Sequence, residues 1–156
     1  MNFKHKRVAV GGTFDYFHAG HKALLRNAFE SGESVVIGVS SDDFVKKLGK
    51  SIEQKFNYRV EKLKNSLNSS FPNRRCEIHP LNDHFGLVIS DKNIDAIVVS
   101  EETLDKAKEA NELRKAKGLK PLKIIKIDTV LADDGLPVSS TRIRNKEIDE
   151  EGHKIR

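Results

Sequence analysis

Short β-branched runs alternate with stretches of helical spacing along this chain, and few folds accommodate that order. The runs lie at residues 7–10, 34–39, 76–79, 94–99 and 122–127. The stretches between them place apolar residues on one helical face. Strands that alternate with helices pair in parallel through right-handed crossovers. We therefore expect an α/β fold, a Rossmann-like open five-stranded parallel sheet with helices on both faces.

Three main helices are predicted between these strands. The first follows the first strand and ends at Gly32, the second carries an apolar stripe over residues 56–67, and the third spans residues 101–117. Residues 83–91 predict a shorter helix or a loop. The charged tail after Arg144 predicts a last helix or a frayed end. In such a sheet the ligand lies beyond the carboxyl ends of the strands, so the loops after strands one, two, four and five are the places for chemistry.

Composition excludes several classes of protein. A length of 156 residues favours one domain over residues 1–156. The apolar runs are only a few residues long, whereas a membrane helix needs about 20, and no apolar signal region follows the basic N-terminal segment. Cys76 is the only cysteine, which excludes an internal disulfide and favours a reducing cytoplasm. Its β-branched neighbours predict an inert core position for the thiol.

The positive charge of the chain is concentrated in one segment. The formal net charge is +5, from 28 Lys and Arg against 23 Asp and Glu. Aromatic residues make up 6% and Trp is absent, so stacking platforms for a nucleic acid are poorly supplied. Residues 44–64 hold seven cations against two acids. This excess directly after the second strand favours small phosphorylated substrates over nucleic acid.

The loop after the first strand carries the strongest chemical signal. Residues 11–21 read GGTFDYFHAGH, which is neither a dinucleotide fingerprint nor a P-loop. The two glycines let the backbone approach a ligand, and the following helix start presents N–H groups to an anion. His18 and His21 can donate to phosphate oxygens there, although either could instead cap the helix. Asp15 is expected to hold the loop through backbone hydrogen bonds. Metal ligation is not favoured, because an HExxH glutamate is missing.

This loop resembles the signature of the HxGH nucleotidylyltransferases, in which a GTFD segment precedes HxGH. Residues 138–144, VSSTRIR, are similar to the second signature of that superfamily, ISSTxIR. The run SEET at residues 100–103, followed by Asn111 and Arg114, resembles the archaeal and eukaryotic type of phosphopantetheine adenylyltransferase. The similarity covers about residues 8–144 and departs from that family just after SEET, where glycines are common.

The resemblance implies a reaction. Its members transfer the adenylyl group of ATP to 4′-phosphopantetheine and form dephospho-coenzyme A and pyrophosphate. One phosphate attacks the α-phosphorus of the other substrate, so no protein nucleophile is required and catalysis consists of positioning and charge neutralisation. Mg²⁺ is expected to arrive with ATP and to be held by phosphates and waters. The partners are these small molecules, with no nucleic acid and no membrane, and the oligomeric state does not follow from the sequence.

The resemblance also implies catalytic roles. His21 and Lys46 are expected to stabilise the transition state, with His18 near the nucleotide phosphates. Counting alone does not decide between Lys46 and Lys47 as the lysine that faces the phosphates. Thr13, which matches the threonine of GTFD, is expected to orient the attacking phosphate.

Further residues are expected to bind substrate. Asn111 and Arg114 share a helix face and could reach a phosphate or the ribose, although Arg114 could be an ordinary surface charge. Glu101 could accept a hydrogen bond from ribose, although acids are common at helix starts. The hydroxyls of residues 139–141 suit the β- and γ-phosphates, or a plain N-cap. The expected ATP-binding set is Gly11, Gly12, Thr13, Phe14, His18, His21, Glu101, Ser139, Ser140, Thr141 and Arg142.

Other functions remain as alternatives. FMN adenylyltransferase and glycerol-3-phosphate cytidylyltransferase share the HxGH arrangement, but they tend to carry a different run after the fourth strand. A nucleotide-sensing domain without turnover would be expected to lack a motif histidine or the lysine of the second loop, and this chain retains both.

Overall fold

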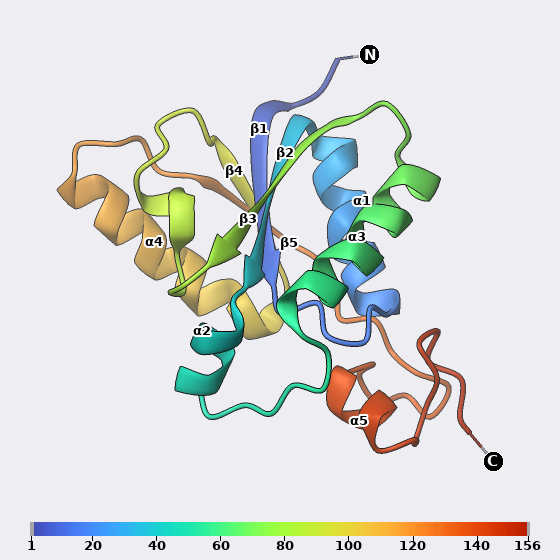
Figure 1. The fold of residues 1–156 in the computed structure, drawn as a ribbon. Coiled ribbons are helices and arrows are strands. Elements are labelled where there is room, and N and C mark those ends of the chain that lie inside the picture. The colour runs from blue at the N-terminus through green and yellow to red at the C-terminus, as the bar shows by residue number, and fades with distance from the viewer. Residues whose placement is uncertain (1, 156) are drawn as a thin grey trace.

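The computed structural model describes residues 2–155, so the two ends of the expected domain, residues 1 and 156, lie outside the described part. Five parallel strands form one sheet in the order β3-β2-β1-β4-β5. The strands are β1 (His5–Gly12), β2 (Gly32–Ser40), β3 (Arg75–Leu81), β4 (Ala96–Val99) and β5 (Lys123–Lys126). The predicted fold class and all five predicted strands are confirmed (Figure 1).

Helices cover both faces of the sheet. α1 (Ala19–Ser31) and α3 (Phe56–Ser70) lie on one face, and α4 (Leu104–Ala116) lies on the other with the short 3-10 helix η1 (Gly86–Ile89) (Figure 1). The predicted third helix is divided into the 3-10 helix η2 (Glu101–Thr103) and α4. Two short helices, α2 (Asp42–Lys47) and α5 (Ser140–Arg144), lie at the carboxyl ends of the strands.

The tail differs from both expectations for it. After α5 the chain makes turns and an antiparallel bridge between Ile148 and Lys154, and the side chain of Ile148 is fully buried. The amide of Ala19, at the start of α1, donates to the carbonyl of Glu150 at 2.9 Å. The tail is therefore folded against the first helix.

The core lies between the central strands and the helices. Val35, Ile37 and Val39 of β2 are completely buried, and they pack with Phe29 of α1 and Leu63 of α3. Strands buried on both faces read as continuous apolar runs, which explains the β-branched segments of the sequence. No helix within residues 2–155 has the length and apolar character needed to cross a membrane.

Gly32 ends the first helix by a route that the sequence did not predict. Its backbone is extended rather than left-handed, and the chain enters β2 at once. A Cβ at this position would lie 2.6 Å from Cγ2 of Val8, so the glycine permits close packing of the helix end on β1.

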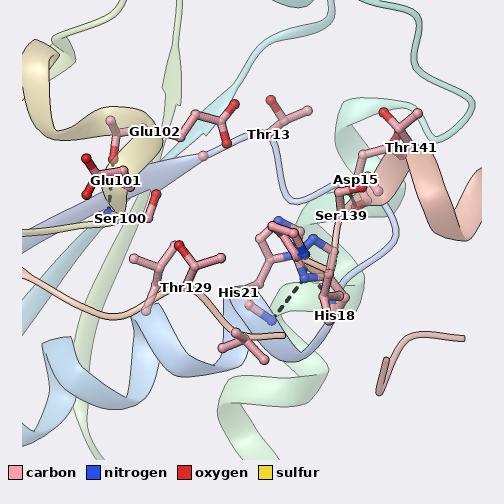
Figure 2. A pocket seen from close by; sticks show the side chains of 18 of the residues that line it. Thr13, Asp15, His18, His21, Ser100, Glu101, Glu102, Thr129, Ser139 and Thr141 are labelled. Carbon is pink, nitrogen blue, oxygen red and sulfur yellow. Dashed lines mark hydrogen bonds between the residues drawn. The ribbon is translucent and has the colours of Figure 1, made fainter. Parts of the chain in front are cut away.

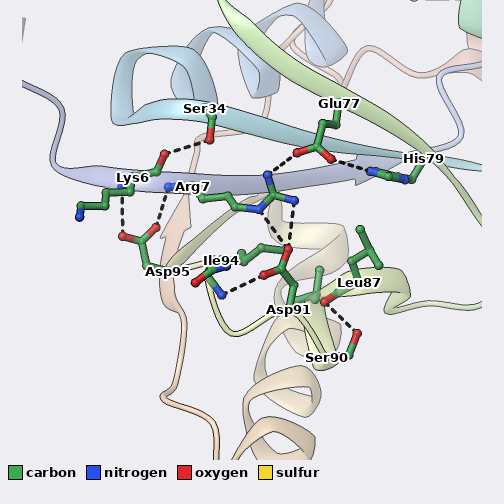
Figure 3. Close-up of polar contacts among 12 residues, drawn as sticks. Lys6, Arg7, Ser34, Glu77, His79, Leu87, Ser90, Asp91, Ile94 and Asp95 are labelled. Atoms are coloured by element: carbon green, nitrogen blue, oxygen red, sulfur yellow. Dashed lines mark hydrogen bonds and ion pairs between the residues drawn. The ribbon is translucent and has the colours of Figure 1, made fainter.

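Ion pairs join the amino-terminal half of the sheet. The guanidinium of Arg7 on β1 contacts Glu77 on β3 and reaches Asp91 at 3.0 Å (Figure 3). Cys76 on the edge strand β3 is exposed, so the prediction of a core thiol is wrong. β3 has a neighbouring strand on only one side, and its residues 75–77 are all exposed.

Opposite these ion pairs lie the carboxyl ends of the strands, where the chain enters the loops. We call this end of the sheet its carboxyl edge and the end that holds Arg7 its amino edge. The strand order reverses between β1 and β4, so the gap between the carboxyl ends of these two strands is the topological switch point of the sheet. Ligands of open α/β sheets bind at such points. A ligand site is therefore expected at the carboxyl ends of β1 and β4.

Candidate active site

A cavity of about 890 Å³ opens at the carboxyl ends of the strands. Its walls come from the β1–α1 loop with the start of α1, the segment after α2, residues 100–103, residues 127–130 and the start of α5. The loops after strands one, two, four and five thus meet at one cavity, as predicted. Figure 2 shows the rings of His18 and His21 between Glu101 and Glu102 on one side and Ser139 on the other.

The two histidines form a stacked pair at the start of α1. Their ring centroids lie 3.7 Å apart with an interplanar angle of 17°. Nδ1 of His18 accepts a hydrogen bond from the amide of Gly20 at 3.0 Å, and Nδ1 of His21 accepts from the amide of His18 at 3.2 Å. The alternative reading of the histidines as helix caps is therefore correct for both, but it occupies only one nitrogen of each ring.

These caps fix the chemical state of the other nitrogen. Because each Nδ1 accepts a hydrogen bond, the proton of each neutral ring resides on Nε2. Burial lowers the pKa of His18 to about 4. Burial and the neighbouring His18 lower the pKa of His21 well below 6.5. At neutral pH both rings are therefore uncharged and present an Nε2–H donor.

The motif glycine between them is required by this arrangement. A Cβ on Gly20 would lie 2.9 Å from Cε1 of His18, so a larger residue would displace the ring. The amides of Ala19 and Gly20 are already bonded to Glu150 and His18. The helix start therefore offers fewer free N–H groups than the sequence suggested, and the two Nε2–H groups add neutral donors to it.

A buried carboxylate links the first loop to α5. Asp15 is 2% exposed, and its Oδ2 accepts from Nη2 of Arg144 at 2.6 Å. The hydroxyl of Ser140 donates to the carbonyl of Asp15. Asp15 therefore has a structural role, but its carboxylate holds the loop through the ion pair with Arg144 and not through the expected backbone hydrogen bonds, and its Oδ1 has no hydrogen-bond partner. Sequence reasoning missed Arg144, which lines the cavity and ends the VSSTRIR motif that could have indicated it.

The segment between α2 and α3 crosses beside the cavity and is tied to the same loop. Lys50, Ser51 and Ile52 line the cavity. The amide of Tyr16 donates to Oε1 of Gln54 at 3.0 Å, and the Tyr16 hydroxyl bonds to Glu53. The first loop and this segment therefore form a connected wall.

The opposite wall carries acids and hydroxyls. Glu101, Glu102 and Thr129 line it, and Thr129 follows β5 without a sequence motif to mark it. The ammonium of Lys126 forms an ion pair with Glu101 and lowers the pKa of that carboxyl. Glu101 therefore already has a partner, which leaves its predicted contact with ribose as a prediction.

Two of the expected substrate-binding residues lie elsewhere. Arg114 is 1% exposed and donates to the carbonyls of Lys120, Val88, Asp91 and Ile94 at 2.8–3.2 Å. Asn111 donates to the carbonyl of Leu122 at 3.1 Å and accepts from its amide at 2.7 Å. Neither residue lines the cavity. The prediction that they bind substrate is wrong, because the shared helix face points into the protein.

The other expected residues divide into three groups. Gly11, Gly12, Thr13, His18, His21, Glu101, Ser139, Ser140 and Thr141 line the cavity. The side chain of Phe14 instead belongs to the core, and Arg142 pairs with Asp134 and Glu147 away from the cavity lining. Lys46 and Lys47 are exposed on α2 and do not line the cavity, so their roles remain predictions.

Comparison with known proteins shows the family to which the chain belongs. The cytidylyltransferase-like family matches residues 9–146. A phosphopantetheine adenylyltransferase from Methanothermobacter thermautotrophicus is 46% identical over 156 residues, which span 100% of this chain and 93% of that protein. A protein of the same name from Methanopyrus kandleri is 46% identical over 145 residues, which span 93% of this chain and 92% of that protein.

Solved structures agree in fold. A protein of unknown function from Archaeoglobus fulgidus has a TM-score of 0.69 and 31% identity, with 78% of this chain and 97% of that chain covered. Pantoate-beta-alanine ligase from Francisella tularensis has a TM-score of 0.60 at 16% identity, with 93% and 67% covered, which is a likeness of fold alone. The chain therefore belongs to the cytidylyltransferase-like family and, within it, to the phosphopantetheine adenylyltransferases.

Proposed function

We propose that this chain transfers the adenylyl group of ATP to 4′-phosphopantetheine, a step of coenzyme A biosynthesis. The observation that carries the proposal is the pair of capped, neutral imidazoles of His18 and His21 in the wall of the switch-point cavity. The relatives named phosphopantetheine adenylyltransferase, which align over almost their full length, supply the identity of the substrates.

The reaction needs no group of the protein to form a bond. A phosphate oxygen of 4′-phosphopantetheine attacks the α-phosphorus of ATP. The bond from that phosphorus to the oxygen of the β-phosphate breaks, and pyrophosphate leaves with the electron pair. Negative charge spreads over the oxygens of the α-phosphate and the leaving group during this step, so fixed donors accelerate it.

The cavity residues suit that demand. The Nε2–H groups of His18 and His21 would donate to phosphate oxygens without a change in protonation. Lys50 and Arg144 add cationic side chains to the lining. Thr13 would orient the attacking phosphate from the loop that also carries the histidines.

Mg²⁺ is part of this proposal as a companion of ATP. Within residues 2–155 no group of three His, Cys, Asp or Glu side chains could hold a metal ion. Mg²⁺ keeps several waters and is commonly bound through substrate phosphates, so we propose that the phosphates of ATP carry it into the site. The ion would neutralise part of the charge on the β- and γ-phosphates.

The test is the release of pyrophosphate by the purified protein. ATP and CTP are each offered with 4′-phosphopantetheine, FMN or glycerol 3-phosphate, and dephospho-coenzyme A is identified by mass. Turnover is expected only with ATP and 4′-phosphopantetheine. Turnover only with FMN or only with CTP would overturn the substrate assignment. Binding of ATP without any turnover would instead favour a nucleotide sensor.

We also propose a cytoplasmic location for the enzyme. ATP is available there, and a chain with a single cysteine is compatible with a reducing compartment.

A further inference from the structure

Arg59 on α3 is completely buried, although it carries a charge. Its relative exposure is 0%, and burial of an unpaired charge is strongly unfavourable. Its Nη2 donates to Oδ1 of Asp42 at 2.8 Å, an ion pair that offsets part of this cost. Burial alone would raise the pKa of Asp42, but hydrogen bonds from Arg59 and from the amide of Phe56 outweigh it and lower the pKa.

The remaining donors of Arg59 reach three backbone segments. Nη1 donates to the carbonyl of Thr13 at 2.6 Å and to the carbonyl of Ser40 at 2.8 Å. Nε donates to the carbonyl of Gln54 at 2.9 Å. One planar guanidinium thus joins the loop after β1, the end of β2 and the segment after α2.

All three segments are parts of the cavity wall or lead into it. Thr13 lines the cavity, Ser40 precedes α2, and Gln54 follows the cavity-lining residues 50–52. Arg59 itself does not line the cavity. It therefore acts on the site through the backbone of its neighbours.

The contact at Thr13 fixes an orientation as well as a distance. The peptide bond after Thr13 is trans and planar, so a carbonyl held by Arg59 also directs the next N–H away from the guanidinium. Phe14 follows with a φ of 55°, a left-handed conformation that is unfavourable for a bulky residue. A strained turn of this kind persists only where its surroundings hold it.

We infer that Arg59 is a positioning residue for adenylyl transfer, which holds the Thr13 loop and the start of α2 at the separation that the two phosphates need. The inference rests on the proposed function for its assay. Lysine cannot replace the guanidinium, because a single ammonium cannot span three carbonyls and a carboxylate arranged around a planar fork.

The experiment compares R59K with R114K. Arg114 is a matched control because it is also buried and binds backbone carbonyls, but none of the residues that supply those carbonyls lines the cavity. Both variants are expected to have a lower Tm. Measured per folded molecule, R59K should lose about 100-fold in kcat, the scale of a 1 Å misplacement of reacting groups. The KM for ATP should also rise in R59K, but by a smaller factor than kcat falls, and R114K should keep both constants.

The outcomes are distinct. Equal loss of Tm with unchanged kcat in both variants would overturn the inference and leave Arg59 a structural residue. If R59K does not fold, D42N decides, since it keeps an acceptor but removes the charge that orients Arg59. A fall in kcat per folded D42N molecule supports the inference, and an unchanged kcat overturns it.

A failure of the proposed function would be visible separately. In that case the wild-type protein would not form dephospho-coenzyme A. The same variants would then be compared by their Kd for ATP, measured by calorimetry. Weaker ATP binding by R59K but not by R114K would support a positioning role for whatever reaction the site performs, and equal Kd values would overturn it.

Discussion

Two buried arginines hold opposite edges of the same sheet. Arg59 binds backbone carbonyls at the carboxyl ends of β1 and β2, beside the cavity. Arg114 binds carbonyls that precede β4 and β5, at their amino ends. One of these carbonyls belongs to Asp91, whose carboxylate pairs with Arg7 in the network that Figure 3 shows.

The two arginines differ in position and in one contact, because Arg59 also pairs with the carboxylate of Asp42, whereas the hydrogen bonds of Arg114 all go to carbonyls. Each guanidinium satisfies carbonyl groups that would otherwise be buried without a partner, and each contributes stability in this way. Only the carboxyl edge of a parallel sheet carries the ligand. A substitution there should therefore change turnover as well as stability, whereas one at the amino edge should change stability alone.

The largest effect is expected from His21 at the carboxyl edge. His21→Ala removes an Nε2–H donor and should lower kcat by about 10²–10³-fold, as does loss of one transition-state donor elsewhere. It also removes a helix cap, which should cost about 1 kcal/mol of unfolding free energy. Steady-state kinetics and urea unfolding measure the two losses.

Two further variants separate the two roles of this histidine. His21→Asn retains an acceptor near the position of Nδ1 but no donor at Nε2, so it should keep the cap and still lose kcat. His21→Gln should retain a donor near Nε2 and lose the cap. If His21→Asn loses less than about tenfold in kcat, His21 is a helix cap alone and the carboxyl edge differs less from the amino edge than we infer.

A second prediction concerns the stability of the fold at acidic pH. The pKa of His18 is about 4 in the folded protein, below the ordinary 6.5, so the unfolded chain binds the proton first. The stability contribution is complete above pH 6.5 and is lost as the pH falls from 6.5 towards 4. The loss should be roughly 3 kcal/mol for His18, with His21 acting in the same direction.

Urea midpoints measured across this pH range provide the test. The Asp42 carboxyl, whose lowered pKa stabilises the fold, affects stability only near and below its ordinary value of 3.8, so it does not interfere. His18→Asn cannot titrate and should give a flatter profile. A profile as steep as that of the wild-type protein would show that other groups carry the acid dependence.

A substitution of Asn111 tests whether the amino edge affects stability without affecting turnover. Asn111→Ala removes two hydrogen bonds to the buried Leu122 and should cost about 1–3 kcal/mol of unfolding free energy. kcat and the KM values for ATP and 4′-phosphopantetheine should stay unchanged per folded molecule. A raised KM without a loss of stability would restore the substrate-binding role that the sequence suggested and would break the distinction between the edges.

The sequence predicted the sheet, the main helices and the position of the cavity, because these depend on hydrophobic periodicity and on loops that follow strands. The motif residues His18, His21 and Thr13 line the cavity as expected. Periodicity did not reveal α2, although Ser41, the acids after it and the lysines at its end are typical of a short capped helix.

The arginines show where sequence reasoning stops. Arg59 lies one turn from Leu63, and Arg114 lies one turn from Ala110, on the buried faces of their helices. This spacing indicates burial, but it does not show which groups accept the hydrogen bonds of a buried guanidinium. Their burial depends on carbonyl groups that come from residues 5–46 positions away in the chain. Only tertiary structure brings these acceptors together, so the role of each arginine follows from the edge of the sheet that it joins.

The smallest effect is expected at Cys76, which belongs to neither arginine network. Cys76→Ser should change the unfolding free energy by less than about 0.5 kcal/mol and leave kcat unchanged, because the side chain is exposed on an edge strand. A thiol reagent should label the native protein, although burial of part of the side chain and the nearby Glu77 raise the pKa of the thiol and slow the reaction. Labelling that required unfolding would place the thiol in the core. It would also mean that another segment covers β3 at this position, in contrast to the exposed residues 75–77.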